Sequence, residues 1–353
     1  MTTSLRPSSV CRYVILILLP SMVLFVRPLS GQEQGRFRIM FYNVENLFDT
    51  SNDSLVKDEE FLPEGDKHWD ADKYYKKLNN IYKVIISCGE WDPPAVVGLC
   101  EVENRGVLKD LVGDTPLDKF GYRIVHFDSP DERGIDVAML YRWDLFSPDT
   151  AYPLPVTFPG DPEDHTRDIL IVKGTLGGAG TIHFFINHWP SRSGGYEASK
   201  PKRNRAAEVL RQAVDSVLKQ DAQAGIVIMG DFNDGPLDES LKDHLLAATD
   251  EGSADTAALI NLMAPFAGIP GVGTLKFREN WDVFDQLIVS SGLLDGSGPL
   301  RVDPEGAHIH NPSFLTENDE RYLGVRPFRT YAGPRYLGGY SDHFPVFLDL
   351  IAH

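Results

Sequence analysis

Polar side chains that can bind a metal ion or a phosphate follow several apolar runs of this chain. In IVIMGDFNDGP, a run of apolar residues ends at Asp231 and Asn233. Asn43 follows RIMFY, Glu101 follows VVGLC and His188 follows HFFIN. A single acid or amide at the end of a strand is usually a turn former, so each position alone predicts a turn. The repetition of the pattern is what indicates a site.

Three more groups of this kind stand beside apolar runs near the carboxyl terminus. Asp285 opens DQLIVS, and Asp342 and His343 precede FPVFLDL. If all these strand ends meet at one edge, several carboxylates face one cleft, and crowded carboxylates need a cation or a protonated histidine among them. Carboxylate and amide oxygens favour Mg²⁺, with Mn²⁺ or Ca²⁺ as alternatives, and no cysteine spacing of a zinc site is present. Mg²⁺ held by oxygens is the usual partner of phosphate substrates.

Short apolar runs predict the strands that would hold these groups, and many are apolar on both faces, as strands buried between layers are. The predicted strands span residues 36–43, 95–101, 122–128, 135–142, 168–176, 181–189, 225–231, 284–290 and 344–351. Apolar residues at helical spacing predict helices over 70–87 and 201–219, and long loops are expected at about 49–69 and 293–340. So many strands predict an α/β (α+β) body in which two mixed β-sheets pack face to face with helices outside, in four layers.

The first 31 residues have the composition of a cleaved secretory signal. Arg6 and Arg12 precede the 14-residue apolar run YVILILLPSMVLFV, which is shorter than the roughly 20 residues of a membrane-spanning helix. An uncleaved anchor is the alternative. We therefore expect a signal peptide over 1–31, a single domain over 32–353, and a secreted or periplasmic monomer with no stable membrane association.

The charge of the body limits its partners. The chain has a net charge of −17, and residues 1–31 hold three arginines and no acid, so the charge without them is −20. Such a body repels a polyanion at long range, which disfavours tight binding of DNA through a large basic face but leaves a local basic groove open. Cys88 and Cys100 lie in or beside apolar runs, which predicts two separate buried thiols, although export would permit a disulfide.

The motifs together resemble the endonuclease/exonuclease/phosphatase superfamily, which includes DNase I-like and exonuclease III-like nucleases, inositol polyphosphate 5-phosphatases and neutral sphingomyelinases. The resemblance runs from about Phe37 to Leu350, and the order and spacing of the motifs agree. They are FYNVENLFD, GLCEVEN, GIDVAMLYR, NHWPSR, MGDFND, FDQLIVS and YSDHFPV. The resemblance implies a DNase I-like fold and a metal-dependent phosphoester hydrolase.

The resemblance also implies a role for each matching residue. Glu101 would be the principal metal ligand, with Asn43 and Asp342 close to the metal. Asp231 would align or deprotonate the attacking water. Asn233 would hold a phosphate oxygen and help to orient that water.

The two histidines have different implied roles. His343 would contact the phosphate, with Asp285 fixing its tautomer and favouring its cationic form. His188 would help to stabilise or protonate the leaving oxygen. Arg192 lies just after His188 and Arg133 directly precedes GIDVAMLYR, and both are candidates for phosphate binding.

We favour a phosphodiesterase or nuclease that uses metal-assisted in-line attack of water on phosphorus, acting on a phosphoester substrate and possibly on nucleic acid. A phosphomonoesterase, or a phosphatase of lipid or sugar phosphates, is the alternative within the same fold, because fold does not select the substrate. A non-catalytic binding module is a third class, but it predicts gaps in the catalytic set, and the set is complete.

Overall fold

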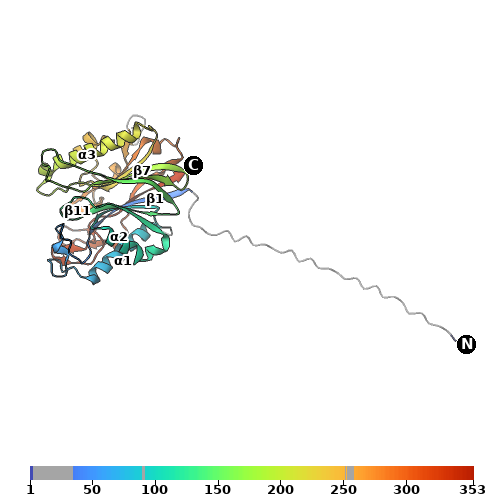
Figure 1. The fold of residues 1–353 in the computed structure, drawn as a ribbon, viewed down its shortest axis with the longest axis horizontal. Helices are drawn as coiled ribbons and strands as arrows, with labels where there is room; N and C mark the ends of the chain where they lie inside the picture. Colours follow the sequence, from blue (N-terminus) through green and yellow to red (C-terminus); the bar gives the residue numbers. More distant parts are fainter. Residues whose placement is uncertain (3–34, 90–91, 251, 253–257) are drawn as a thin grey trace. The chain divides into compact units, whose positions relative to one another are not determined.

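Two β-sheets pack face to face in the body of the chain, and helices cover their outer faces (Figure 1). The computed structural model describes residues 1–2, 35–89, 92–250, 252 and 258–353. Within the unit formed by Gln32–His353, α3 covers one sheet and α1 and α2 cover the other. The predicted four-layer α+β sandwich is therefore confirmed. The predicted signal segment lies almost wholly outside the described residues and stays a prediction.

Each sheet combines parallel and antiparallel neighbours. The order of the first sheet is β14-β19-β1-β2-β4-β3, and that of the second is β5-β6-β7-β8-β13-β10-β9. The first sheet comprises β14 (Leu300–Ile309), β19 (Val346–Ala352), β1 (Arg36–Leu47), β2 (Val96–Val102), β4 (Asp136–Arg142) and β3 (Tyr122–His126). The second comprises β5 (Phe146–Leu154), β6 (Ile169–Leu176), β7 (Gly180–His188), β8 (Gly225–Asp231), β13 (Asp285–Ser290), β10 (Leu259–Asn261) and β9 (Ala247–Ala248). All nine predicted strands are present.

The helices and the smaller elements lie outside or between these strands. The longer helices are α1 (Ala71–Cys88), α2 (Arg105–Gly113) and α3 (Tyr196–Leu218). The short helical turns are η1 (Glu59–Phe61), η2 (Pro116–Phe120), η3 (Ser240–His244), η5 (Ala264–Phe266), η6 (Ser291–Leu293) and η7 (Ser313–Leu315). The small hairpins are β11 (Leu275–Phe277) with β12 (Asn280–Asp282), β15 (Thr316–Asn318) with β16 (Val325–Pro327), and β17 (Tyr331–Ala332) with β18 (Arg335–Tyr336).

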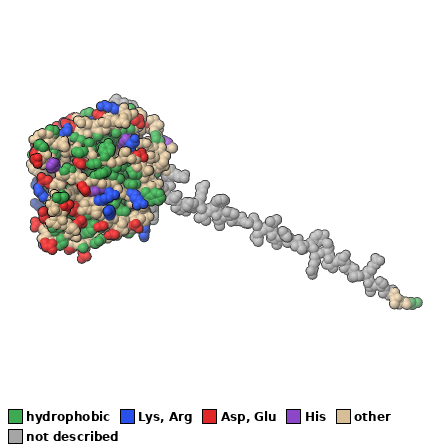
Figure 2. Space-filling model, viewed as in Figure 1, with side chains coloured by type: hydrophobic (Ala, Val, Ile, Leu, Met, Phe, Trp, Pro, Cys, Tyr) green, Lys and Arg blue, Asp and Glu red, His purple; other side chains and the backbone are tan. Residues whose placement is uncertain are grey.

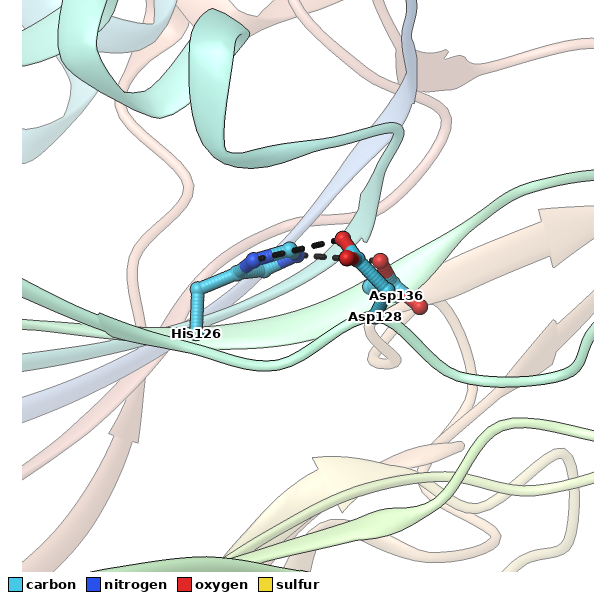
Figure 3. Close-up of side chains that lie close together, drawn as sticks. All are labelled: His126, Asp128 and Asp136. Carbon is cyan, nitrogen blue, oxygen red and sulfur yellow. Dashed lines mark hydrogen bonds and ion pairs between the residues drawn. The ribbon is translucent and has the colours of Figure 1, made fainter. Parts of the chain in front are cut away.

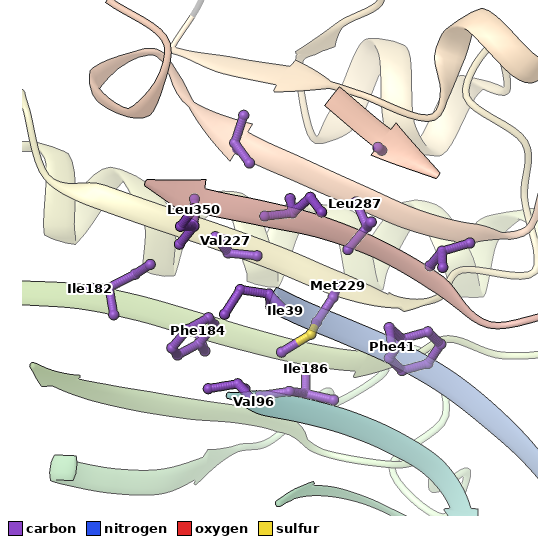
Figure 4. Close-up of a cluster of buried hydrophobic side chains, with 14 of the residues drawn as sticks. Ile39, Phe41, Val96, Ile182, Phe184, Ile186, Val227, Met229, Leu287 and Leu350 are labelled. Atoms are coloured by element: carbon purple, nitrogen blue, oxygen red, sulfur yellow. The ribbon is translucent and has the colours of Figure 1, made fainter. Parts of the chain in front are cut away.

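The main core fills the space between the two sheets. Ile39, Phe41 and Val96 of the first sheet meet Phe184 and Met229 of the second, and all five are fully buried (Figure 4). Burying a large apolar side chain contributes roughly 1.5–3 kcal/mol to stability. This layer therefore holds one sheet in a fixed position against the other. A rigid contact between the sheets is what allows side chains from both to meet precisely at one edge.

The predicted loop over 293–340 is wrong in part, because β14 runs through it. β14 is a ten-residue strand at the edge of the first sheet, and it contains Pro304 and a register shift between Val302 and Ala307. The edge strand β5, which contains two prolines, was also not predicted. Proline is tolerated at sheet edges and bulges, so edge strands can lack the continuous apolar run that predicts a strand.

The predicted helix 201–219 begins earlier than expected, at Tyr196. Pro201 lies within it, and the turn before Pro201 has a polar outer surface, so the apolar periodicity gave no sign of that turn. The predicted helix over 70–87 agrees with α1, whose amino terminus is capped by Asp70 through a hydrogen bond from the Lys73 backbone N–H.

Cys88 and Cys100 are buried and unbonded to each other, as predicted. No helix in the described part of the chain is long and apolar enough to cross a membrane. On the face shown in Figure 2, acidic and basic side chains are intermixed with apolar ones.

Candidate active site

The predicted site residues meet where the carboxyl ends of parallel strands reach the same edge of the two sheets. β7 and β8 are parallel and place His188 beside Asp231, while antiparallel β13 places Asp285 on the other side of Asp231. Asn43 joins the sheets, because its Nδ2 donates to Oε1 of Glu101 at 3.3 Å and to Oδ2 of Asp231 at 3.1 Å. Glu101 belongs to the first sheet and Asp231 to the second, so the site is built across the sandwich.

Bulges and unusual backbone angles aim the side chains at this edge. The pairing of β1 with β2 shifts between Asn43 and Leu47, and β2 shifts against β4 between Cys100 and Val102. Glu101 has a φ of +61° and Asn233 a φ of +50°, which non-glycine residues rarely adopt. Such strain costs on the order of 1–3 kcal/mol per residue and persists where the surroundings impose it, commonly at functional sites.

Asp231 is a buried carboxylate in the centre of the site. Its Oδ1 accepts a hydrogen bond from the Asn233 backbone N–H at 2.9 Å, and Asn233 in turn donates from Nδ2 to the Trp189 carbonyl at 3.1 Å. Burial raises the pKa of Asp231 to about 7, with His343 opposing the shift and Asp285 adding to it. A carboxylate with this pKa can accept a proton near neutral pH.

His343 and Asp285 form a buried ion pair next to Asp231. Nδ1 of His343 lies 2.7 Å from Oδ2 of Asp285, and its Nε2 lies 3.8 Å from Oδ2 of Asp231. Burial opposes the charge of the imidazole, but Asp285 and then Asp231 outweigh it and hold the pKa of His343 well above its usual value. The ring is therefore a cation whose Nε2 faces the site.

His188 is the opposite kind of imidazole. Its Nε2 lies 3.7 Å from Oδ2 of Asp231 and 3.9 Å from Oε1 of Glu101. Burial, and then the charges of Arg167 and Arg133, lower the pKa of His188 well below its usual value. The ring is neutral, so this geometry favours a hydrogen bond from His188 over protonation of the leaving oxygen by its cationic form.

Asp342 directly precedes His343 in the sequence. It is paired with Arg329. Burial opposes its charge, but His343 and then Arg329 outweigh burial and hold the pKa of Asp342 below its usual value. Glu45 lies nearby, where its carboxylate accepts a hydrogen bond from the Thr330 N–H at 2.6 Å. Lys77 reaches the same segment from α1 and donates to the Tyr340 carbonyl at 2.7 Å.

The two predicted phosphate-binding arginines have different surroundings. Arg192 donates to the Asn233 carbonyl at 2.8 Å, to Asp234 at 3.0 Å and to Asp238 at 2.7 Å. Its charge is already balanced by carboxylates, which makes it a support for the Asn233 turn. Arg133 has a half-exposed side chain and lies close enough to His188 to lower that residue's pKa.

Several functional neighbours were not predicted from the sequence. Arg167 is buried, donates to the carbonyls of His188 at 3.1 Å and Trp189 at 2.6 Å, and pairs with Asp131 at 2.9 Å. Its only sequence sign was an arginine directly before an apolar strand. Lys77 gave no sign at all, because a lysine in an amphipathic helix normally faces solvent.

The donor set at the edge fits a hard divalent cation. Glu101 presents carboxylate oxygens held by the Asn46 N–H at 3.0 Å, and Asp342 adds a second carboxylate. Asn43 lies directly beside Glu101, with its Nδ2 facing the carboxylates and its Oδ1 accepting from the Glu45 N–H at 2.9 Å. Carboxylates that lie close together repel one another, and here one of them has a raised pKa. A bound cation stabilises such a group.

A second group of metal-type side chains lies at the β3–β4 edge. His126, Asp128 and Asp136 point toward one another (Figure 3). Their ligand atoms all lie within 4.8 Å of one another. Nε2 of His126 is hydrogen-bonded to Oδ2 of Asp136 at 2.9 Å.

The sequence from 38 to 352 matches the model of the Endonuclease/Exonuclease/phosphatase family. The chain therefore belongs to this family, whose members are phosphoester hydrolases and are generally dependent on divalent metals. A search of curated proteins gave no match.

Solved structures share the fold. An endonuclease/exonuclease/phosphatase family protein from Bacteroides thetaiotaomicron is 16% identical with a TM-score of 0.55, covering 90% of this chain and 95% of its own. A mannosyl-6-phosphatase from the same organism is 17% identical with a TM-score of 0.55, covering 89% of this chain and 99% of its own. The catalytic domain of human Nocturnin is 15% identical with a TM-score of 0.53, covering 90% of this chain and 95% of its own. At these identities the likeness shows the fold.

Proposed function

We propose that this protein is a secreted or periplasmic, Mg²⁺-dependent phosphoester hydrolase that cleaves phosphodiesters by in-line attack of water on phosphorus. The observation that carries the proposal is the meeting of Asp231, the cationic His343 and Glu101 at one edge of the two sheets. These residues supply a base, a positive hydrogen-bond donor and a metal ligand within one cleft. Mn²⁺ or Ca²⁺ can replace Mg²⁺ in such an oxygen-rich site.

Asp231 positions the attacking water and accepts its proton. A pKa of about 7 makes its carboxylate a competent base near neutral pH. Asn233 is held at a φ of +50° next to Asp231, where its side chain can contact a phosphate oxygen. Burial of Asp231 excludes bulk water from the reacting proton.

His343 stabilises the charge that develops on the phosphoryl oxygens. Asp285 holds Nδ1 at 2.7 Å, so Nε2 carries a proton directed at the site. A preorganised cationic donor of this kind is worth more in a buried site than in water. Glu101 and Asp342 would hold Mg²⁺, which when bound would polarise a phosphoryl oxygen and stabilise a leaving alkoxide. Asn43, whose Nδ2 donates to Glu101 at 3.3 Å, would orient that carboxylate close to the metal.

A panel of phosphoesters tests this function. The purified protein is assayed with Mg²⁺, Mn²⁺ and Ca²⁺ on DNA, RNA, bis-p-nitrophenyl phosphate, lipid phosphodiesters and phosphomonoesters, with Asp231→Asn as the matched control. We expect metal-dependent hydrolysis of at least one phosphodiester that Asp231→Asn lacks. Intact substrates in every arm would favour a non-catalytic binding role instead.

A phosphomonoesterase is the second candidate. It is supported by the fold shared with a mannosyl-6-phosphatase, at a TM-score of 0.55. In the same panel it predicts release of phosphate from monoesters while bis-p-nitrophenyl phosphate stays intact.

The location and the monomeric state belong to the same proposal. The support for export is the composition of residues 1–31, in which Arg6 and Arg12 precede a 14-residue apolar run. Cell fractionation with mass spectrometry of the mature amino terminus tests export, and light scattering tests the monomer. An amino terminus at Met1 in a membrane fraction would favour the uncleaved anchor.

A further inference from the structure

A cavity of about 190 Å³ opens directly beside the proposed metal ligands. It shares Asp342 with them, and it reaches Glu101 through Asn46, whose backbone N–H donates to Oε2 of Glu101 at 3.0 Å. Glu45, Arg329 and Lys67 complete its polar lining. A phosphoester bound at Glu101 therefore has this cavity as a neighbour for one of its organic groups.

The charges around the cavity are balanced. Glu45 and Asp342 are acidic, and Lys67 and Arg329 are basic, so the formal charge of the lining is zero. The charges are also matched locally, since Arg329 pairs with Asp342 and Lys67 lies 3.9 Å from Glu60. A lining of this kind gives no net attraction for a second phosphate or carboxylate, and its many polar atoms favour a neutral, polar group.

Two of the residues that line this cavity carry polar atoms without a hydrogen-bond partner in the described part of the chain. The Asn46 side-chain amide is half-buried and has no hydrogen-bond partner among the described residues. Nε of Arg329 is buried without a hydrogen bond and lies 3.8 Å from Oε1 of Glu45. Buried polar groups in native structures normally have partners, so free donors and acceptors in a cavity indicate a ligand that completes them.

Aromatic rings and size restrict the ligand further. Phe61 and Tyr331 line the cavity, and Nζ of Lys67 lies 5.0 Å from the Tyr331 ring centroid and donates to the Gly333 carbonyl at 3.0 Å. The volume lies below the roughly 300–1,000 Å³ of pockets that enclose drug-sized ligands. A space of this size, with polar walls and ring edges, suits one small ring or chain that carries several hydroxyl groups.

We propose that this cavity, lined by Glu45, Asn46, Lys67, Arg329, Tyr331 and Asp342, binds the hydroxyl-rich organic group of the substrate, such as a single sugar ring. This inference rests on the proposed phosphoester hydrolase function and names the substrate class of that site. The Asn46 amide both donates to and accepts from hydroxyl groups.

Ligand affinity tests the subsite without relying on turnover. The Asp231→Asn protein is titrated with glucose 6-phosphate and with phenyl phosphate in the presence of Mg²⁺ by calorimetry. We expect glucose 6-phosphate to bind about tenfold more tightly than phenyl phosphate, because its hydroxyl groups make at least one more net hydrogen bond with the cavity. Equal affinity for the two, or no binding of either, overturns the subsite.

Asn46→Gly, added to Asp231→Asn, identifies the residue responsible. Asn46 has a φ of +55°, which glycine adopts without strain, so the change removes the amide and leaves the backbone in place. We expect the preference for glucose 6-phosphate to fall about tenfold while the affinity for phenyl phosphate is unchanged. The matched control is Leu323→Gly, a residue with a φ of +61° that is 78% exposed, which should alter neither affinity.

The two proposals fail separately. If the parent protein hydrolyses bis-p-nitrophenyl phosphate but shows no preference for the sugar ester, the subsite is overturned and the hydrolase function stands. If the sugar preference is present and depends on Asn46 but no phosphoester is hydrolysed, the hydrolase function is overturned and the cavity remains a binding site for a hydroxyl-rich group.

Discussion

Two groups of histidine and aspartate side chains lie at strand ends of this protein. They differ in whether the protein itself supplies hydrogen-bond partners for their buried polar atoms. The group at the β3–β4 edge is His126, Asp128 and Asp136. Both oxygens of Asp136 have protein partners, since Oδ2 bonds to His126 at 2.9 Å and Oδ1 accepts from the Ser129 N–H at 2.8 Å. The buried members of this group are hydrogen-bonded by the fold itself.

In the group at the candidate active site, some buried polar atoms have no hydrogen-bond partner within the described part of the protein. Oδ1 of Asp285 and Nδ1 of His188 are buried without hydrogen bonds. Burial raises the pKa of Asp231 to about 7, and the neighbouring carboxylates Asp285 and Glu101 add to the shift. Composition alone makes the two groups look alike. The difference shows that a site is recognised by polar groups that the protein positions but leaves for a ligand to complete.

Replacing the central aspartate of each group by asparagine should give the largest difference in kcat between the groups. Asp231→Asn keeps the shape but removes the base, so we expect kcat to fall on the order of 10²–10⁴-fold. Asp136→Asn should leave kcat unchanged and lower the free energy of unfolding by about 1–3 kcal/mol, because a buried hydrogen-bond network is disturbed. Steady-state kinetics and denaturant unfolding measure both. Equal loss of activity in the two variants would abolish the distinction.

Two neighbouring glutamates, Glu101 and Glu103, should differ in how their replacement changes the Mg²⁺ dependence of activity. Glu101→Gln should raise the Mg²⁺ concentration for half-maximal activity at least about tenfold, with activity partly returning at high Mg²⁺. Glu103→Gln is the matched control, because Glu103 is buried two residues away and accepts from the Asp49 N–H at 2.7 Å. An unchanged Mg²⁺ titration for Glu101→Gln would show that Glu101 is not the ligand.

The partner of the cationic histidine has a smaller expected effect. Asp285→Asn removes the charge that holds Nδ1 of His343 at 2.7 Å, so we expect kcat to fall about 10–100-fold with little change in KM. Asp295→Asn, at an exposed turn, should have no effect. If Asp285→Asn changed KM and left kcat intact, its role would lie in substrate binding rather than in orienting His343.

His310, a half-buried histidine outside both groups, has the smallest expected effect. Burial, and then Arg38, lower the pKa of His310 to about 4 from 6.5. The unfolded chain therefore binds a proton between pH 6.5 and 4 that the folded chain does not, so stability falls as the pH drops through this window. His310→Gln should reduce that fall by about 1–2 kcal/mol, a figure discounted for the partial exposure of the ring. Urea unfolding at pH 7 and pH 4.5 measures the free energy of unfolding of the parent and of His310→Gln. An identical decrease between the two pH values in both proteins would contradict the prediction.

Much of the fold was predictable from local sequence. All nine predicted strands and both predicted helices exist, because a buried strand or an amphipathic helix displays its environment in its own apolar pattern. The strand-end residues that carry the proposed chemistry were found for the same reason. Asp231 follows directly from the apolar run of β8, and Asp285 opens that of β13. The edge strands β5 and β14 escaped because their prolines interrupt such runs.

Only the tertiary structure decided how these residues are paired and charged. Lys77 of α1 reaches Thr330, 253 positions later, and Glu45 reaches the same residue from 285 positions away. The sequence pattern alone could not show that His188 is neutral and His343 cationic, because burial and neighbouring charges set a pKa. The sequence by itself determined which side chains stand at the strand ends. The packing of two sheets determined which of them meet, what they leave unpaired, and therefore what they can do.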